Sequence, residues 1–165
     1  MINSNIARVT KLLVDDLKIA ITRQSINDEL QRHPHPNSML AISDVLANWG
    51  IPNAPYELSV NELTMLPVPF IAYLKSGKFV LISTMSDNEV IVSNEVWHRK
   101  LFSIDDFKKV FSGSVLAVEK DEISEESNYR SKRRKEILES IRVPFVIIGT
   151  VVVFFRFFNY KQPLR

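Results

Sequence analysis

The side chains that could carry out chemistry are few in this chain of 165 residues, which contains three histidines and no cysteine. His33 and His35 form a His-x-His pair between prolines, a spacing that can bind a metal ion. The nearest carboxylates, Asp28 and Glu29, belong to the predicted helix before the pair, and the third histidine, His98, is far from it in the sequence. We therefore interpret the pair as a loop between two helices and expect neither a metal ion nor a cofactor. Ser38 is expected to cap the second of these helices rather than to act as a nucleophile.

The absence of cysteine excludes disulfide frameworks, thiolate metal sites and cysteine nucleophiles. The four glycines do not fall in a phosphate-binding spacing, which argues against a nucleotide-binding loop. The adjacent carboxylates of Asp15 and Asp16 have no partner site in the sequence, so we interpret them as a solvated helix face. Trp49 and Trp97 are interpreted as packing residues rather than as ligand-stacking residues.

The formal net charge of +2 conceals an uneven distribution along the chain. Residues 1–118 carry 11 Lys and Arg against 12 Asp and Glu, whereas residues 119–165 carry 10 against 7. A nucleic-acid-binding domain needs a basic face on its folded part. Because residues 1–118 are close to neutral, we do not expect nucleic acid as a partner.

Hydrophobic spacing and capping residues predict helices first and strands afterwards. Gly50 suits the left-handed position that ends a helix, and Ser59 with Glu62 three residues later is typical of a capping box. Helices before an antiparallel sheet indicate the α+β class for residues 1–118. The expected helices are 6–21, 25–32, 38–49, 59–66 and 103–111, and the expected strands are 68–74, 79–85, 90–92 and 114–118.

The composition changes twice after Val118. Residues 119–142 are predicted to be a linker that is first acidic and then basic, and an uncharged apolar run begins at Val143. The basic residues that we expect to set membrane topology are Arg130, Lys132, Arg133, Arg134 and Lys135.

The apolar run predicts one C-terminal transmembrane helix at 143–160, followed by a short tail at 161–165. Eighteen helical residues extend for about 27 Å, close to the hydrocarbon thickness of about 30 Å. A buried core strand and an interfacial helix are the alternatives. The run is longer than an ordinary strand and has no polar face, so a transmembrane helix fits better.

The positions of the cations predict the orientation of this helix. They precede the apolar run, which favours residues 1–135 in the cytoplasm. We therefore expect a single-pass protein of the bacterial inner membrane whose N-terminal domain is cytoplasmic. The expected partners are the lipid bilayer and either a peptide or a membrane protein.

Several stretches of the N-terminal part carry a family resemblance. They are the segment His33-Pro-His-Pro-Asn-Ser-Met-Leu-Ala-Ile-Ser-Asp-Val-Leu-Ala-Asn-Trp-Gly50, the segment Leu66-Pro-Val-Pro-Phe-Ile-Ala-Tyr-Leu74, and residues 79–82 and 107–118. Over about residues 5–118 the chain resembles the papain-like peptidase domain of bacteriocin-processing exporters. These are the double-glycine leader peptidases, cysteine peptidase family thirty-nine. The resemblance implies a papain-like peptidase-type fold and, in the family, proteolysis.

The entry to the third predicted helix is similar to a narrower group. In that group this domain precedes a membrane-embedded vitamin K epoxide reductase-type domain and a thioredoxin-like domain, mostly in Bacteroidetes-type bacteria. The basic linker and the apolar run after it fit the same architecture. The cysteine pair of such a reductase is not present in this sequence.

The catalytic residues that the resemblance implies are all replaced in this chain. The family's nucleophilic cysteine falls near Arg8 and its oxyanion-hole glutamine near Ile2. The histidine position is Lys78, in Gly77-Lys78-Phe79-Val80, and the aspartate position is Asn94. A thiolate, its base and an orienting carboxylate are all needed for this chemistry. These degenerate positions therefore predict that the chain is not a cysteine peptidase.

Three functions follow from these patterns. The leading hypothesis is a membrane-anchored, catalytically inactive peptidase-like domain that binds a peptide or supports a membrane partner. The first alternative is the N-terminal fragment of a vitamin K epoxide reductase-type thiol oxidoreductase. The second alternative is a residual peptidase acting on double-glycine leader peptides.

Overall fold

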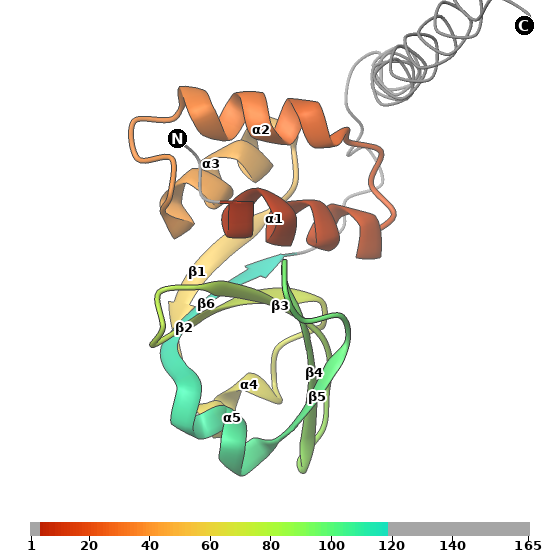
Figure 1. Ribbon diagram of the computed structural model, residues 1–165, viewed down its shortest axis with the longest axis vertical. Helices are drawn as coiled ribbons and strands as arrows, with labels where there is room; N and C mark the ends of the chain where they lie inside the picture. The colour runs from red at the N-terminus through yellow and green to blue at the C-terminus, as the bar shows by residue number, and fades with distance from the viewer. Residues whose placement is uncertain (1–3, 119–165) are drawn as a thin grey trace, which may run out of the picture. The chain divides into compact units, whose positions relative to one another are not determined.

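The computed structural model describes residues 4–118, in which three helices precede all six strands (Figure 1). These helices lie together on one side of a six-stranded sheet. The helices are α1 (Ser4–Asp16), α2 (Arg23–Arg32), α3 (Met39–Asn48), α4 (Val60–Leu63) and α5 (Ile104–Val110). The strands are β1 (Asn53–Glu57), β2 (Phe70–Leu74), β3 (Phe79–Met85), β4 (Glu89–Ser93), β5 (Lys100–Ser103) and β6 (Phe111–Val118).

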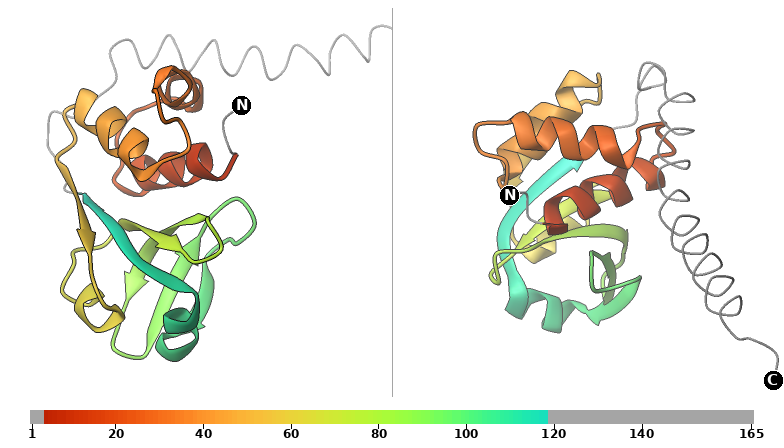
Figure 2. Two further views of the ribbon diagram at one scale, coloured as in Figure 1. Left: turned by 90° about the vertical axis from the view of Figure 1, so that its left-hand side faces the viewer. Right: turned by 45° about the horizontal axis from the view of Figure 1, so that its top comes forward.

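The sheet is antiparallel throughout, with the strand order β1-β6-β2-β3-β4-β5. Strands β2 to β5 follow one another as a meander, and β6 returns to lie between β1 and β2. The sheet is strongly curved, as Figure 2 shows. The predicted α+β class with an antiparallel sheet is therefore confirmed.

Alternation along the central strands divides the core between the two faces of the sheet. In β3, Phe79 and Leu81 belong to the cluster under α1–α3, whereas Val80 and Ile82 belong to the cluster on the concave face. Successive strand residues point to opposite faces, so this run of buried residues serves both clusters. Burial of each such side chain stabilises the fold by about 1.5–3 kcal/mol. The short helices α4 and α5 cover part of the concave face, where Leu63 and Phe107 are buried.

The ends of the helices agree with the predicted capping residues in two places. Ser38 caps α3 by accepting a hydrogen bond from the Ala41 N–H at 3.1 Å, and Gly50 follows the helix with φ 72°. The capping box before α4 is present, because the Ser59 N–H donates to the Glu62 carboxylate at 2.7 Å. The predictions for Ser38, for Gly50 and for the capping box are confirmed.

Two helix boundaries differ from the prediction. The N-cap of α2 is Thr22, whose Oγ1 accepts from the Ser25 N–H at 3.1 Å, so the helix begins before Ser25. Helix α1 ends at Asp16 because the chain turns at Lys18, which adopts the left-handed region with φ 58°. The apolar pattern continues past this turn because the irregular segment buries Ile21 under the helices.

Within residues 4–118, no helix is long and apolar enough to cross a membrane. The predicted linker at 119–142, the predicted transmembrane helix at 143–160 and the tail at 161–165 lie outside the described residues. The basic residues that were expected to set topology lie there too.

Candidate functional site

The N-terminal turn of α1 is fastened to the start of β3 by one side chain. Asn5 is 1% exposed, and its Oδ1 accepts a hydrogen bond from the Phe79 N–H at 2.7 Å. Its Nδ2 donates to the Phe79 carbonyl at 2.9 Å. The carboxamide therefore satisfies both backbone groups of Phe79, as a neighbouring strand would.

Two charged side chains extend this contact toward solvent. Asn5 Nδ2 also donates to the carboxylate of Glu95. Glu95 follows Asn94, in the turn after the end of β4. The other carboxylate oxygen of Glu95 pairs with Lys78 Nζ at 2.5 Å. The Lys78 side chain is 46% exposed, whereas that of Glu95 is 18% exposed. We call Asn5, Lys78 and Glu95 the polar cluster.

The surroundings of Glu95 lower the pKa of its carboxyl group. Burial, the largest single effect, would raise the pKa of its carboxyl group. Hydrogen bonds from Lys78, Asn5 and the residue's own backbone, with the Lys78 charge, outweigh burial and lower that pKa below its ordinary value. Glu95 is therefore a carboxylate at neutral pH, and it accepts hydrogen bonds from both partners.

The chemistry that the polar cluster offers is hydrogen bonding and charge. It presents an amide, an ammonium group and a carboxylate, and none of its three residues is a thiol or an imidazole. Peptide hydrolysis of the papain type requires a thiolate with an imidazole base. The cluster can position and bind polar groups, but it does not contain that pair.

The side chain of Lys78 forms its ion pair with Glu95 and not with Asn94, and no hydrogen bond or ion pair joins it to Arg8 in the described residues. Among the described residues, its carboxylate partner is Glu95, one position after Asn94. The Asn94 side chain is turned to the backbone, where its Oδ1 accepts from the N–H groups of residues 96 and 97 at 2.8 and 2.7 Å. On α1 the side chain that hydrogen-bonds to the start of β3 is Asn5, about one helical turn before Arg8. The assignment of Arg8 and Asn94 as degenerate catalytic positions remains a prediction, and Ile2 lies outside the described residues.

Sequence reasoning missed Asn5 and Glu95 as members of the site. One signal was available, because Asn5 lies four residues before Val9 and so shares the apolar stripe of α1. A polar residue in such a stripe is buried, and a buried amide needs partners. Nothing comparable identifies Glu95, whose role depends on the turn after β4.

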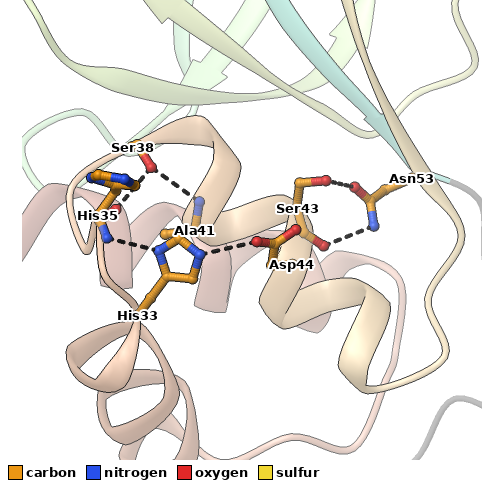
Figure 3. A network of polar contacts seen from close by, with 7 residues as sticks. All are labelled: His33, His35, Ser38, Ala41, Ser43, Asp44 and Asn53. Atoms are coloured by element: carbon orange, nitrogen blue, oxygen red, sulfur yellow. Dashed lines mark hydrogen bonds and ion pairs between the residues drawn. The ribbon is translucent and has the colours of Figure 1, made fainter.

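The His-x-His element joins α2 to α3, as expected of a loop (Figure 3). His33 Nδ1 accepts from the His35 N–H at 3.0 Å, and His33 Nε2 lies 3.0 Å from a carboxylate oxygen of Asp44 on α3. A carboxylate that is 11 residues away in the sequence is therefore close to His33 in space. Residues 4–118 contain no group of three His, Asp or Glu side chains that could hold a metal ion.

The remaining candidate residues, the aspartate pair on α1 and the two tryptophans, have surroundings that explain them without a ligand. Asp15 pairs with Lys11 at 2.5 Å on the exposed side of α1. Trp49 packs against the helical side of the core. Trp97 packs against Phe102, with 5.3 Å between ring centroids. The interpretations of these residues as a solvated helix face and as packing residues are confirmed.

The elements that meet at the polar cluster define the class of the domain. The start of the first helix, the start of β3 and the turn after β4 converge, which is the arrangement that the papain-like resemblance implied. The fold is an α+β domain of the papain-like peptidase type. Residues 6–123 match the family model described as the Peptidase C39 family, so the chain belongs to that family.

Solved structures with the same fold come from transport proteins. A double glycine motif protease from an AMS/PCAT transporter, solved in complex with the leader peptide, has a TM-score of 0.63 at 11% identity over 73% of this chain and 90% of its own. The peptidase domain of Streptococcus ComA, a bi-functional ABC transporter involved in a quorum sensing pathway, has a TM-score of 0.62 at 11% identity, covering 73% and 96%.

A third structure is similar to nearly the same extent. The N-terminal peptidase C39 like domain of the toxin secretion ATP-binding protein from Vibrio parahaemolyticus has a TM-score of 0.58 at 14% identity, covering 73% of this chain and 100% of its own. At these identities the three likenesses establish the fold. A search of curated proteins found no match to the sequence.

Proposed function

We propose that this chain is a non-catalytic member of the Peptidase C39 family, and that it binds a peptide or supports a membrane partner. The observation that carries the proposal is the polar cluster. Asn5 and Glu95 meet beside Lys78, the position at which the resemblance implies a histidine, and the sequence contains no cysteine. A site so occupied has hydrogen-bonding groups and no nucleophile of the papain type.

Lys78 is the member of the cluster that a ligand would reach. Both carboxylate oxygens of Glu95 are engaged by the other two residues, and Asn5 is buried against Phe79. The Lys78 ammonium carries three N–H groups, and its bond to Glu95 uses one of them. With 46% of its side chain exposed, Lys78 can donate to the carbonyl of a bound peptide.

A peptide is the favoured ligand because a domain with the same fold was solved with a peptide bound. The double glycine motif protease from an AMS/PCAT transporter was solved with a leader peptide bound. By analogy, a peptide ending in two glycines would lie across the polar cluster of this chain and remain intact there.

Membrane anchoring is part of the same proposal. It is supported by the uncharged run that begins at residue 143 and by the five cations at 130–135 that precede it. An anchored domain would meet its ligand at the cytoplasmic surface of the bacterial inner membrane, where a membrane partner would also be within reach.

Peptide binding can be tested with fluorescence anisotropy. The probe is a fluorescein-labelled leader-like peptide with two terminal glycines, and the protein is the full chain in nanodiscs of zwitterionic lipid. We expect saturable binding that weakens about five- to tenfold in Lys78→Met, because a hydrogen bond to a charged donor contributes about 1.5–3 kcal/mol at full burial and less at a partly exposed site.

Lys75→Met is the matched control, because Lys75 lies in the same turn as Lys78 and its Nζ donates to the Lys109 carbonyl. It should bind the peptide as the unchanged chain does. No saturable change at millimolar peptide would refute the peptide-binding proposal.

A further inference from the structure

One connection of the sheet presents large apolar side chains and cations to solvent. It is the segment Val96-Trp97-His98-Arg99-Lys100-Leu101, which leads from the end of β4 into β5 and which we call the β4–β5 turn. Val96 is 71% exposed and Leu101 is 54% exposed. His98, Arg99 and Lys100, which lie between them in the chain, are exposed too. Neighbouring apolar side chains this exposed, with polar residues around them, are typical of protein or membrane interaction sites.

The two cations of the turn have no carboxylate partner within residues 4–118. None of the ion pairs found there includes Arg99 or Lys100. Lys100 Nζ lies 4.5 Å from the ring centre of Trp97 and 4.6 Å from that of Phe102. Aromatic rings attract the charge of an ammonium group but supply no oxygen acceptor, so Lys100 can still donate to an anion.

The carboxylates near the turn are neutralised or lie at the other end of β5. Glu95, directly before the turn, pairs with Lys78. The carboxylates of β4 and α5 lie at the Ser103 end, because Glu89 is directly opposite Ser103 and Asp105 and Asp106 follow it. Ser103 is three residues after Lys100, which corresponds to about 10 Å of strand. The turn is therefore basic, although residues 1–118 as a whole are close to neutral.

The shape of the turn is fixed by its own hydrogen bonds. Asn94 Oδ1 accepts from the N–H groups of residues 96 and 97, and the Asn94 N–H donates to the Trp97 carbonyl at 2.8 Å. Ser93 Oγ accepts from the Arg99 N–H at 3.0 Å, and Arg99 adopts the left-handed region with φ 49°. A surface that is ordered before binding loses little conformational freedom when it meets a partner.

The surface of an anionic bilayer supplies both kinds of contact that the turn offers. Headgroup phosphates would accept from Arg99 and Lys100, while Val96 and Leu101 would enter the boundary between headgroups and acyl chains. The acidic segment 119–126 of this chain also complements the cations, but its single apolar residue is Ile123. It therefore complements the two apolar side chains less well than a bilayer does.

We propose that the β4–β5 turn docks the domain on the surface of an anionic bilayer. The inference rests on the membrane anchor of the proposed function, because two cations alone are a weak contact, worth about fivefold in the binding constant for each. An anchor raises the effective concentration of the turn at the bilayer, so that a weak contact becomes populated. Glu95 directly precedes the turn, and docking would therefore bring the polar cluster close to the headgroups.

The test measures whether position 98 contacts lipid. The chain has no cysteine, so His98→Cys takes up one environment-sensitive NBD label and leaves both apolar residues and both cations in place. The labelled full chain is placed in nanodiscs of phosphatidylcholine, alone or mixed equally with phosphatidylglycerol. We expect the emission to shift to the blue and to be quenched by nitroxide-labelled lipid in the mixed nanodiscs alone. The difference should shrink at about 1 M salt, where the Debye length is about 3 Å.

A second label position serves as the control. Asp87 is exposed in the turn between β3 and β4, at the opposite end of β4. The label on Asp87→Cys should stay unquenched in both kinds of nanodisc.

Charge variants assign the contact to the cations. Arg99→Gln with Lys100→Gln should lower the ratio of docked to undocked chain by about tenfold or more. Arg23→Gln with Arg32→Gln removes the same charge from exposed positions of α2 and should leave the ratio unchanged. Arg99→Gln alone should lower the ratio about fivefold, and it serves if loss of the Lys100 ring contacts prevents folding of the double variant.

The apolar contact has its own matched pair. Leu101→Ser should lower the same ratio about three- to fivefold, because less apolar surface leaves water. Leu40→Ser, on α3, replaces a leucine that is 53% exposed and should have no effect.

The outcomes separate this inference from the anchor. A chain that does not co-elute with phosphatidylcholine nanodiscs would refute the anchor and the docking together. A chain that co-elutes, but whose label at position 98 is not quenched in mixed nanodiscs or is quenched equally without Arg99 and Lys100, would overturn the docking alone. Blue-shifted emission in phosphatidylcholine that is lost when the carboxylates of 119–126 become amides would overturn it in favour of that acidic segment.

Discussion

Asn5 and Phe79 stand 74 residues apart in the sequence, and two hydrogen bonds of 2.7 and 2.9 Å join the carboxamide of the first to the backbone of the second. The pair connects the first helix to a central strand of the sheet. Asn5 therefore holds the helical layer against the sheet.

Replacement of Asn5 by leucine should destabilise the domain by about 2–4 kcal/mol. The change leaves the buried N–H and carbonyl of Phe79 without partners, and each unsatisfied group costs about 1–3 kcal/mol. Urea unfolding followed by tryptophan fluorescence measures the loss, since both tryptophans, Trp49 and Trp97, lie within the described residues.

Asn48→Leu is the control for this prediction, because Asn48 is an exposed helical asparagine at the end of α3. Its free energy of unfolding should change by less than about 0.5 kcal/mol. Equal effects of the two substitutions would show that the Asn5 hydrogen bonds are not needed for stability.

The stability that Glu95 provides should depend on pH. Its pKa is lower in the folded chain than the ordinary value of 4.5, so folding favours the ionised form. This contribution is fully present above the unfolded-state pKa and is lost as the pH falls through the folded-state pKa. Glu95→Gln should therefore be less stable than the unchanged chain at pH 7, and the difference should shrink as the pH falls below 4.5.

The measurement is the urea midpoint of each protein between pH 3 and pH 7. Glu89→Gln removes an exposed carboxylate remote from Lys78 and should leave the midpoint nearly unchanged at pH 7. A Glu95→Gln difference that grows toward acid pH would contradict the sign worked out here.

The proposed membrane anchor predicts how truncated chains fractionate. Removal of residues 136–165 should move the protein from the membrane pellet to the supernatant, because it removes the apolar run. Circular dichroism of the released protein should still show folded α+β structure, since both core clusters consist of residues 6–118. Retention in the pellet would count against the anchor, and loss of structure would show that the removed segment is needed for folding.

Orientation is read with reporters fused after Val118. The cations before the apolar run predict an inactive alkaline phosphatase and a fluorescent protein that glows. An active phosphatase at this position would reverse the predicted topology.

Much of the fold could be predicted because its signals are local. The α3 cap at Ser38, the capping box at Ser59 and the strand from Phe79 to Met85 each follow from residues within a few positions of one another. Strand β1 was missed because Pro52 and Pro55 argue against a strand, and Pro55 is tolerated only because β1 is at the edge of the sheet.

Strand β5 was missed for a different reason. Its four residues are mostly exposed, and Leu101 is 54% exposed, so the strand has no buried alternation to recognise. Strand β5 is recognised only by its hydrogen bonds to β4 in the folded chain.

The candidate site was predictable only in part. Lys78 could be named because the turn before β3 and the apolar strand after it give a clear local register, and its assignment as a degenerate catalytic position stays a prediction. Asn5 and Glu95 depend on where a helix and a later turn approach that strand, which sequence spacing alone does not determine. Long-range hydrogen bonds of this kind become visible only in the folded chain.

The absence of cleavage is tested most directly by mass spectrometry. The full chain in nanodiscs is incubated with a synthetic double-glycine leader peptide, beside heat-denatured protein as the control. The polar cluster predicts that the peptide stays intact and that the two incubations give the same spectrum. A fragment ending in the two glycines, which accumulates in proportion to native protein and not to denatured protein, would contradict the proposal that this member of the Peptidase C39 family is non-catalytic.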